Sequence, residues 1–161
     1  MLMDERLEFA DDVAVVVTAD QTDNIGDQVP LSVARDVGGG DSGKLTVAFQ
    51  VTEAFTSGGG ATVAFQVASD ATAAIATNGT QSVHMRTKVF SMAELALGAE
   101  FSIDLPNEAS NEPYELFLGV QAVKAGGAAL TAGKVNAFIT RDYGNWKAYT
   151  APGQSAGDPA P

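Results

Sequence analysis

The hexapeptide TVAFQV occurs twice in this chain, at residues 46–51 and 62–67, with the glycine-rich stretch TSGGG between the copies. Apolar and more polar side chains alternate through both copies, and the apolar face holds Leu45, Val47, Phe49 and Val51, then Val63, Phe65 and Val67. Strict alternation is the pattern of a half-buried β-strand. Because a short glycine-rich loop joins the two strands, we predict that they pair as a β-hairpin. No third copy follows, so the sequence does not indicate a solenoid or propeller.

Short apolar segments recur along the rest of the chain, and glycine or proline separates them. We predict further strands at residues 13–19, 31–37, 82–90, 101–106, 114–123 and 134–142, and polar turns at 20–30 and 124–133. Ser91 and Gly98 are placed to begin and end one short helical segment. Regular alternation of strands and helices is missing, which argues against a parallel α/β sheet. About eight antiparallel strands predict an all-β fold, a jelly-roll β-sandwich.

Acidic residues outnumber basic ones by 20 to 9, which gives a net charge of −11. A surface of this sign repels phosphate backbones and anionic lipids, so neither nucleic acid nor a membrane is an expected partner. The first 36 residues hold nine of the acids, and these form either a solvated surface or an arm that docks on a basic partner. We divide the chain into an acidic N-terminal arm (1–12), a jelly-roll domain (13–150) and a flexible C-terminal tail (151–161).

Few residues are suited to catalysis. The chain has no cysteine, which excludes disulfides, thiolate catalysis and cysteine-bound zinc. His84 is the only histidine; it lies in a predicted strand, and no GxSxG motif accompanies it. A hydrogen-bonding role in a strand is favoured, although the letters alone leave a Ser–His–Asp set open. We therefore expect no enzymatic activity and assign no catalytic residue.

Three patterns resemble binding motifs but lack the required context. Residues 38–44 fit a phosphate-binding loop, yet Leu45 stands where Ser or Thr should hold magnesium, and a strand follows in place of a helix. Residues 78–80 read NGT, a glycosylation sequence that a turn explains better. An Asx-rich turn without EF-hand spacing is favoured over a weak cation site formed by Asp20, Asp23, Asn24 and Asp27. We expect neither a cofactor nor a bound metal.

Aromatic residues concentrate near the C-terminus, where the only tryptophan, Trp146, lies between Tyr143 and Tyr149. Two interpretations stay open: a plug that closes the sandwich, or an interface patch, because Trp and Tyr are enriched at binding hot spots. Together with the acidic arm, this segment gives a set of candidate contacts to a partner protein or to another subunit, namely Asp4, Glu5, Arg6, Phe9, Tyr143, Trp146 and Tyr149.

Three stretches taken together resemble a known family: DERLEFADDVAV at residues 4–15, ARDVGGGDSGKLTVAFQVTEAF at 34–55, and LTAGKVNAFITRDYGNWKAY at 130–149. Their order and spacing are similar to those of the capsid cement (decoration) proteins of tailed bacteriophages, in the family typified by the Bordetella phage cement protein. The glycine-rich loop at 38–44 and the tail at 151–161 depart from that pattern.

The resemblance implies a jelly-roll sandwich on the outer surface of an icosahedral capsid. Such a protein would clamp neighbouring capsomers of an HK97-type major capsid protein against the pressure of packaged DNA. It also implies a homo-oligomer, with a dimer favoured and a trimer possible. A different class of function stays open, because jelly rolls also serve as lectins: a carbohydrate- or receptor-binding module on the virion surface.

Overall fold

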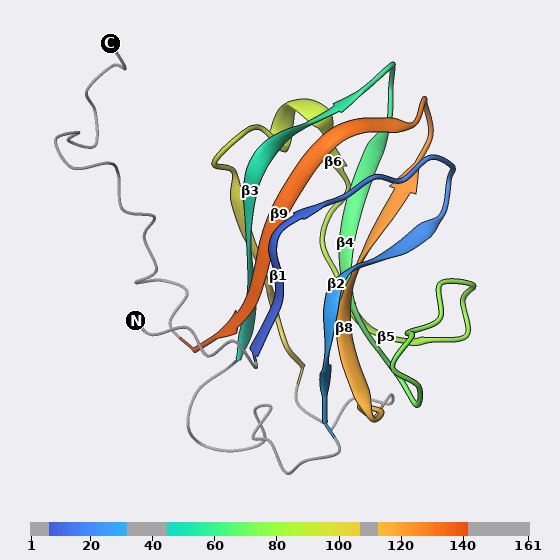
Figure 1. Cartoon of the computed structure of the whole chain (residues 1–161), viewed down its shortest axis with the longest axis vertical. Coiled ribbons are helices and arrows are strands. Elements are labelled where there is room, and N and C mark those ends of the chain that lie inside the picture. The colour runs from blue at the N-terminus through green and yellow to red at the C-terminus, as the bar shows by residue number, and fades with distance from the viewer. Residues whose placement is uncertain (1–6, 32–44, 107–112, 142–161) are drawn as a thin grey trace, which may run out of the picture.

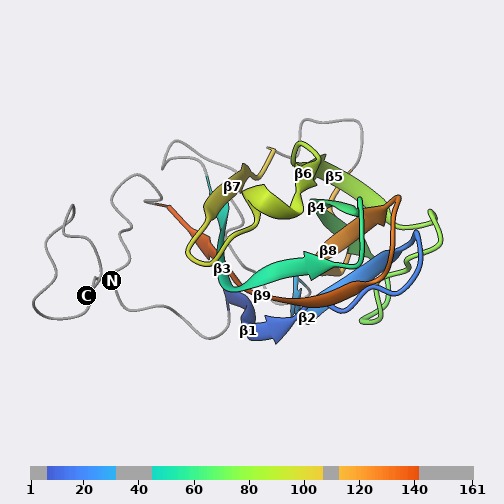
Figure 2. The same cartoon turned by 90° about the horizontal axis from the view of Figure 1, so that it is seen from above.

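The computed structural model describes residues 7–31, 45–106 and 113–141, which form a sandwich of two antiparallel sheets (Figures 1 and 2). One sheet has the order β1-β9-β3-β7, built from β1 (Glu8–Ala14), β9 (Leu130–Thr140), β3 (Thr46–Ser57) and β7 (Glu100–Asp104). The other has the order β2-β8-β4-β5, built from β2 (Thr22–Pro30), β8 (Phe117–Ala125), β4 (Thr62–Asp70) and β5 (Ser82–Arg86). The two-residue β6 (Phe90–Ser91) pairs with β4 and precedes a 3-10 turn, η2 (Met92–Glu94).

The strand order defines the type of sandwich. When β6 is set aside and the other strands are numbered along the chain, the two sheets read 1-8-3-6 and 2-7-4-5. This interleaving of two Greek keys is the jelly roll. The predicted all-β jelly-roll sandwich is therefore confirmed. No helix in the described part of the chain has the length and apolar character to cross a membrane.

The two TVAFQV copies do not pair with each other, so the predicted hairpin is wrong. The first copy lies in β3, which pairs with β7 and β9, and the second lies in β4, which pairs with β5, β6 and β8. The glycine-rich loop between them carries the chain from one sheet to the other. Alternation shows which side chains face a core, but it says nothing about the neighbouring strand.

Phenylalanine rings from both sheets form the centre of the core. The Phe49 ring on β3 lies 5.4 Å from the Phe65 ring on β4, centroid to centroid, across the sandwich. Phe101 on β7 lies 4.9 Å from each of them, and Phe55 and Phe90 also contact Phe65. Phe49 and Phe65 are fully buried, which confirms that their faces of the two strands point inward.

The N-terminal strands differ from the prediction. The first strand begins at Glu8 and not at residue 13, so residues 8–12, assigned to the arm, belong to the sandwich. The predicted polar turn at 20–30 is largely β2. This strand lies at the edge of its sheet, and only Ile25 and Val29 are fully buried in it, so its sequence lacks the apolar alternation of a strand.

The remaining predicted elements mostly occur where expected. The segment 82–90 holds β5 and the start of β6, while 101–106, 114–123 and 134–142 overlap β7, β8 and β9. Ser91 does begin the helical turn, and its backbone N–H donates to Glu94 Oε2 at 2.8 Å. The turn ends earlier than predicted, at Leu95 and not at Gly98. Most of the predicted strand at 31–37 lies outside the described residues.

Candidate functional site

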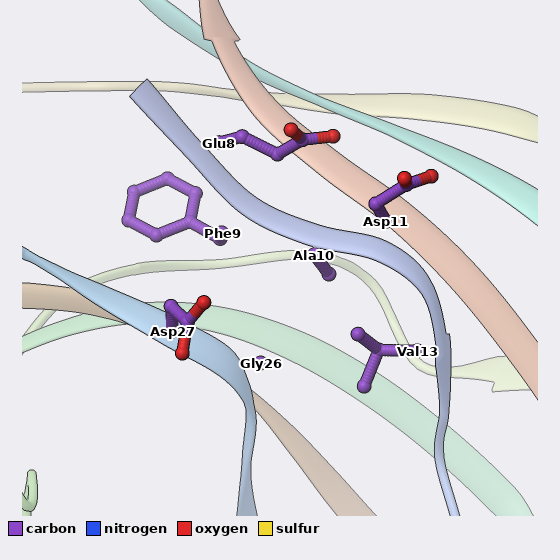
Figure 3. Close-up of a pocket in the computed structure, with 7 residues that line it drawn as sticks. All are labelled: Glu8, Phe9, Ala10, Asp11, Val13, Gly26 and Asp27. Atoms are coloured by element: carbon purple, nitrogen blue, oxygen red, sulfur yellow. The ribbon is translucent and has the colours of Figure 1, made fainter. Parts of the chain in front are cut away.

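A hollow of about 360 Å³ opens where the edge strands β1 and β2 of the two sheets meet (Figure 3). Five of its lining residues come from β1 and two from β2: Glu8, Phe9, Ala10, Asp11 and Val13, then Gly26 and Asp27. Every charged residue in this lining is acidic. The hollow is therefore a concave part of the described surface that could receive a basic group.

Two bulges in β1 and a glycine in β2 shape this edge. The pairing of β1 with β9 shifts register between Glu8 and Ala10 and again before Val13, and such bulges twist a strand locally. As a result, the consecutive residues Phe9 and Ala10 are both buried. Gly26 has φ +61°, and a Cβ at this position would lie 1.9 Å from the Phe9 carbonyl oxygen. Only glycine allows the two strands to approach this closely.

Phe9 was predicted to be an interface residue, and the structure corrects this. Its side chain is 1% exposed and belongs to the hydrophobic core. A side chain so enclosed is a packing residue of the sandwich and offers almost no surface to a partner. The other predicted contacts, Asp4, Glu5, Arg6, Tyr143, Trp146 and Tyr149, lie outside the described residues.

The three carboxylates of the hollow do not converge on one point. Figure 3 shows Glu8 and Asp11 across the β1 ribbon from Asp27, which lies on β2. Within the described ranges, no cluster of three or more acidic or histidine side chains is placed to hold a metal ion. The arrangement fits a diffuse negative field around a concave surface, which attracts extended basic groups more than a compact ion.

Asp12 links three strands on the outer face of the same sheet. Its carboxylate accepts from Lys134 Nζ on β9 at 2.6 Å and from Thr52 Oγ1 on β3 at 2.7 Å. Its backbone N–H donates to Asn136 Oδ1 at 2.7 Å, with Asp12 at φ +50° in one of the bulges. The Lys134 hydrogen bond, followed by the one from Thr52, lowers the pKa of Asp12. We call this set of contacts the Asp12 clasp, because it connects β1 with β9 and β3.

A row of polar side chains crosses the outer face of the second sheet, one from each strand. Asn24, Gln121, Gln66 and Arg86 are direct register partners on β2, β8, β4 and β5. Gln121 Nε2 donates to Asn24 Oδ1 at 2.8 Å, Gln66 Nε2 donates to Gln121 Oε1 at 2.7 Å, and Arg86 Nε donates to Gln66 Oε1 at 2.9 Å. Gln66 and Gln121 are fully buried, so the face of β4 predicted to point outward is also covered.

Part of that cover is the segment from residue 71 to 81 between β4 and β5, which we call the strap. Asn24 Nδ2 donates to the Ile75 carbonyl oxygen at 2.8 Å, and Gln121 Nε2 donates to that of Ala76 at 2.9 Å. The buried Ile75 side chain lies over Gly119, where a Cβ would come within 2.7 Å of Ile75 Cδ1. The Asp70 carboxylate accepts from the Ala76 N–H at 3.0 Å. The strap is thus held by apolar and polar contacts together.

The structure brings His84 and a serine together, but in a structural arrangement. Ser69 Oγ lies 2.7 Å from His84 Nε2 and also accepts the backbone N–H of Glu115 at 3.0 Å. The Glu115 carboxylate accepts from Ser82 at 2.7 Å, and Tyr114 lies against the histidine ring. Ser69 is fully buried, so its hydroxyl is enclosed and is not presented to a substrate.

The four residues considered for a cation site have separate roles. Asp20 binds Lys124 Nζ at 2.8 Å, Asp23 accepts from Gln21, Asn24 belongs to the polar row, and Asp27 lines the hollow. Lys124 was not singled out in the sequence, yet its side chain is buried and also donates to the Gly126 carbonyl oxygen. One signal in the sequence could have indicated this burial. Lys124 follows Leu118, Val120 and Ala122 in steps of two, and these three residues of β8 face the core.

The fold and this edge define a compact jelly-roll protein with an acid-lined hollow and a strapped outer face. A family model named Bbp16 matches residues 9–139, which span the sandwich from β1 almost to the end of β9. The chain therefore belongs to the Bbp16 family, whose name derives from a Bordetella phage. No curated protein matches the chain. The sequence resembles a family of bacteriophage proteins, and the phage origin of the Bbp16 family agrees with this.

Proposed function

We propose that this protein is a structural component of a phage virion that decorates and cements the outer surface of an icosahedral capsid. The observation that carries the proposal is the match of nearly the whole jelly roll to a phage-derived family. The partner is a major capsid protein of HK97 type, and the chain acts as a homo-oligomer, with a dimer favoured. Its role is non-enzymatic and uses no cofactor.

The physical mechanism is simultaneous binding to neighbouring capsomers. A copy that contacts two capsomers gains a high effective concentration for its second contact, so two weak contacts give one strong attachment. A ligand that binds only the assembled shell also stabilises that shell by linkage. The gain is about 2.7 kcal/mol per site when the free protein is at about 100 times its Kd. Summed over many sites, this opposes the outward pressure of packaged DNA.

Charge supports a capsid surface as the location. The net charge of −11 disfavours packaged DNA as a partner and favours basic surfaces of a protein shell. The acid-lined hollow between β1 and β2 is one described place where such a surface could make contact. An acidic exterior would also keep virions apart in suspension.

The test is reconstitution on expanded shells that lack this protein. We expect binding that saturates at a fixed number of copies per shell and a higher temperature of shell disruption, measured by calorimetry. Trp146→Ala should weaken binding, whereas the control Leu97→Ser, at a residue that is 70% exposed, should leave it unchanged. Shells that melt identically with and without the protein would refute the proposal. Glycan binding on an array, with no shell binding, would favour the carbohydrate-binding alternative.

A further inference from the structure

The exposed part of the strap contains an asparagine followed by a glycine, Asn78 and Gly79. Both residues are exposed, and Gly79 has φ +93°, with no atom beyond its two chain neighbours within 4 Å of the position a Cβ would take. In such a pair the backbone nitrogen of the glycine can reach the side-chain carbonyl carbon of the asparagine and close a five-membered ring. A bulkier following residue hinders this approach, whereas glycine leaves it open.

The turn places two donors on the oxygen that would gain charge in this ring closure. Thr80 Oγ1 donates to Asn78 Oδ1 at 2.7 Å, and the Thr80 backbone N–H donates to the same oxygen at 3.2 Å. Addition to an amide carbonyl moves negative charge onto its oxygen, and donors already in place stabilise that charge. The Gly79 N–H donates to Gln81 Oε1 at 2.9 Å, so both reacting groups are held by the next two residues.

We propose that Asn78 is a site of spontaneous deamidation that is assisted by Thr80. The Gly79 nitrogen forms a bond to Asn78 Cγ and gives its proton to water. The side-chain nitrogen then takes up a proton and leaves as ammonia, which produces a cyclic imide. Water opens the imide at either carbonyl and yields aspartate or isoaspartate at position 78. The net reaction consumes one water, releases one ammonia and involves no change of oxidation state.

The modification would change how the strap is held. Gln81 Nε2 donates to Gln121 Oε1 at 3.3 Å and so connects the end of the strap to the buried polar row. Isoaspartate adds a methylene group to the main chain at position 78, three residues before Gln81, and this displaces the contact between Gln81 and Gln121. We expect the isoaspartyl protein to have a looser strap on an intact sandwich, because the main core does not include this segment.

The experiment follows deamidation in the folded, full-length protein at mildly alkaline pH and 37 °C. Peptide mass mapping resolves the mass gain at each asparagine, and chromatography of the same peptides separates the isomers aspartate and isoaspartate, which have equal mass. Asn24 and Asn136 are internal references, since both lie within strands and precede Ile25 and Ala137. Thr80→Val removes the hydroxyl donor and keeps the side-chain shape, Thr80→Ser keeps the donor, and Asn78→Gln removes the reactive residue.

We expect Asn78 to react well before Asn24 and Asn136, and the Thr80→Val protein to react about fivefold more slowly, as loss of one ordinary hydrogen bond in the transition state predicts. Thr80→Ser should react at nearly the original rate. Urea unfolding of each variant confirms that the sandwich is retained. A rate at Asn78 no higher than at the two reference residues would overturn the proposal. An unchanged rate in Thr80→Val would do the same for the assistance by Thr80.

Discussion

The phenylalanine in the second TVAFQV copy lies among four other phenylalanine rings of the core. Phe65 is fully buried and contacts Phe49, Phe55, Phe90 and Phe101. Phe65→Ala should lower the free energy of unfolding by about 3–5 kcal/mol, because it removes a buried ring and leaves a cavity. Urea denaturation measures this loss. Phe65→Leu fills more of the space and should lose clearly less; equal losses would show that the site collapses around alanine.

The Lys124–Asp20 pair gives a second prediction at this scale. The Lys124 side chain is 1% exposed and that of Asp20 is 65% exposed, so the two partners are not equivalent. Asp20→Ala leaves a buried ammonium without its anion and should lower the melting temperature. Lys124→Met removes the charge, keeps the length and should be tolerated better. Melting curves of both variants test this order, and the reverse order would mean that Lys124 is solvated in the folded protein.

Single residues were predictable where one simple rule applied. Period-two alternation correctly placed Phe49 and Phe65 in the core. The same rule put Gln66 outside, whereas the strap and the polar row bury it. Phe9 was assigned to an interface because it lies in an acidic stretch, but bulges in β1 turn it into the core. Local patterns carry no information about such cover or such bulges, since both depend on distant segments.

At the scale of elements, the existence of strands was easier to predict than their partners. The first six residues of β3 and β4 are identical and occupy similar environments, since each strand is a central strand of its own sheet. The edge strand β2 was missed because few of its side chains are buried. Its pairing with β8 also shifts register between Ile25 and Val29, which interrupts the alternation of a regular strand. The strap was also missed, because it is held by the polar row. Asn24, Gln66 and Gln121 are far apart in sequence and form that row only through the register of the sheet.

The strap supports a prediction of its own. Ile75→Ala removes the buried side chain that lies over Gly119. We expect faster hydrogen exchange at the Ala76 amide and faster proteolysis within the strap, because local opening needs fewer contacts to break. The urea midpoint should fall less than in Phe65→Ala, since the strap lies outside the main core. Ala73→Ser, at an exposed strap position, is the control. Protection that stays unchanged in Ile75→Ala would show that the polar contacts suffice.

At the scale of the whole molecule, the number and order of segments along the chain predicted the fold better than any single motif did. The jelly roll followed from the number of strands and the lack of helices, and the strand order confirms it. The resemblance to a phage family rested on three separated stretches, and the match over residues 9–139 agrees with their phage character. The acid-lined hollow was not predictable, because it forms only where β1 and β2 from different sheets meet at Gly26.

The charge of the whole molecule leads to a prediction about acid. Hydrogen bonds and ion pairs lower the pKa of Asp12, Asp20 and Asp70, and those from Lys88 and Ser91 lower the pKa of Glu94 to about 2. A carboxyl whose pKa is lower in the folded state contributes stability above its unfolded value, and this contribution is lost as the pH falls through the folded value. The unfolded values are 3.8 for Asp and 4.5 for Glu. The urea midpoint should therefore decline steadily from about pH 5 to about pH 2.

One variant tests this dependence at both ends of the pH scale. The hydrogen bond from Lys134 lowers the pKa of Asp12, and the same contact raises the pKa of Lys134 above 10.5. A raised lysine pKa contributes stability below 10.5 that is lost as the pH rises further. Asp12→Asn should thus flatten the acid decline and also the loss of stability at strongly alkaline pH, both read from urea midpoints. Asp11→Asn removes the same formal charge one residue away and is the control. If both variants give the same pH profile, net charge and not the Asp12 clasp sets the response.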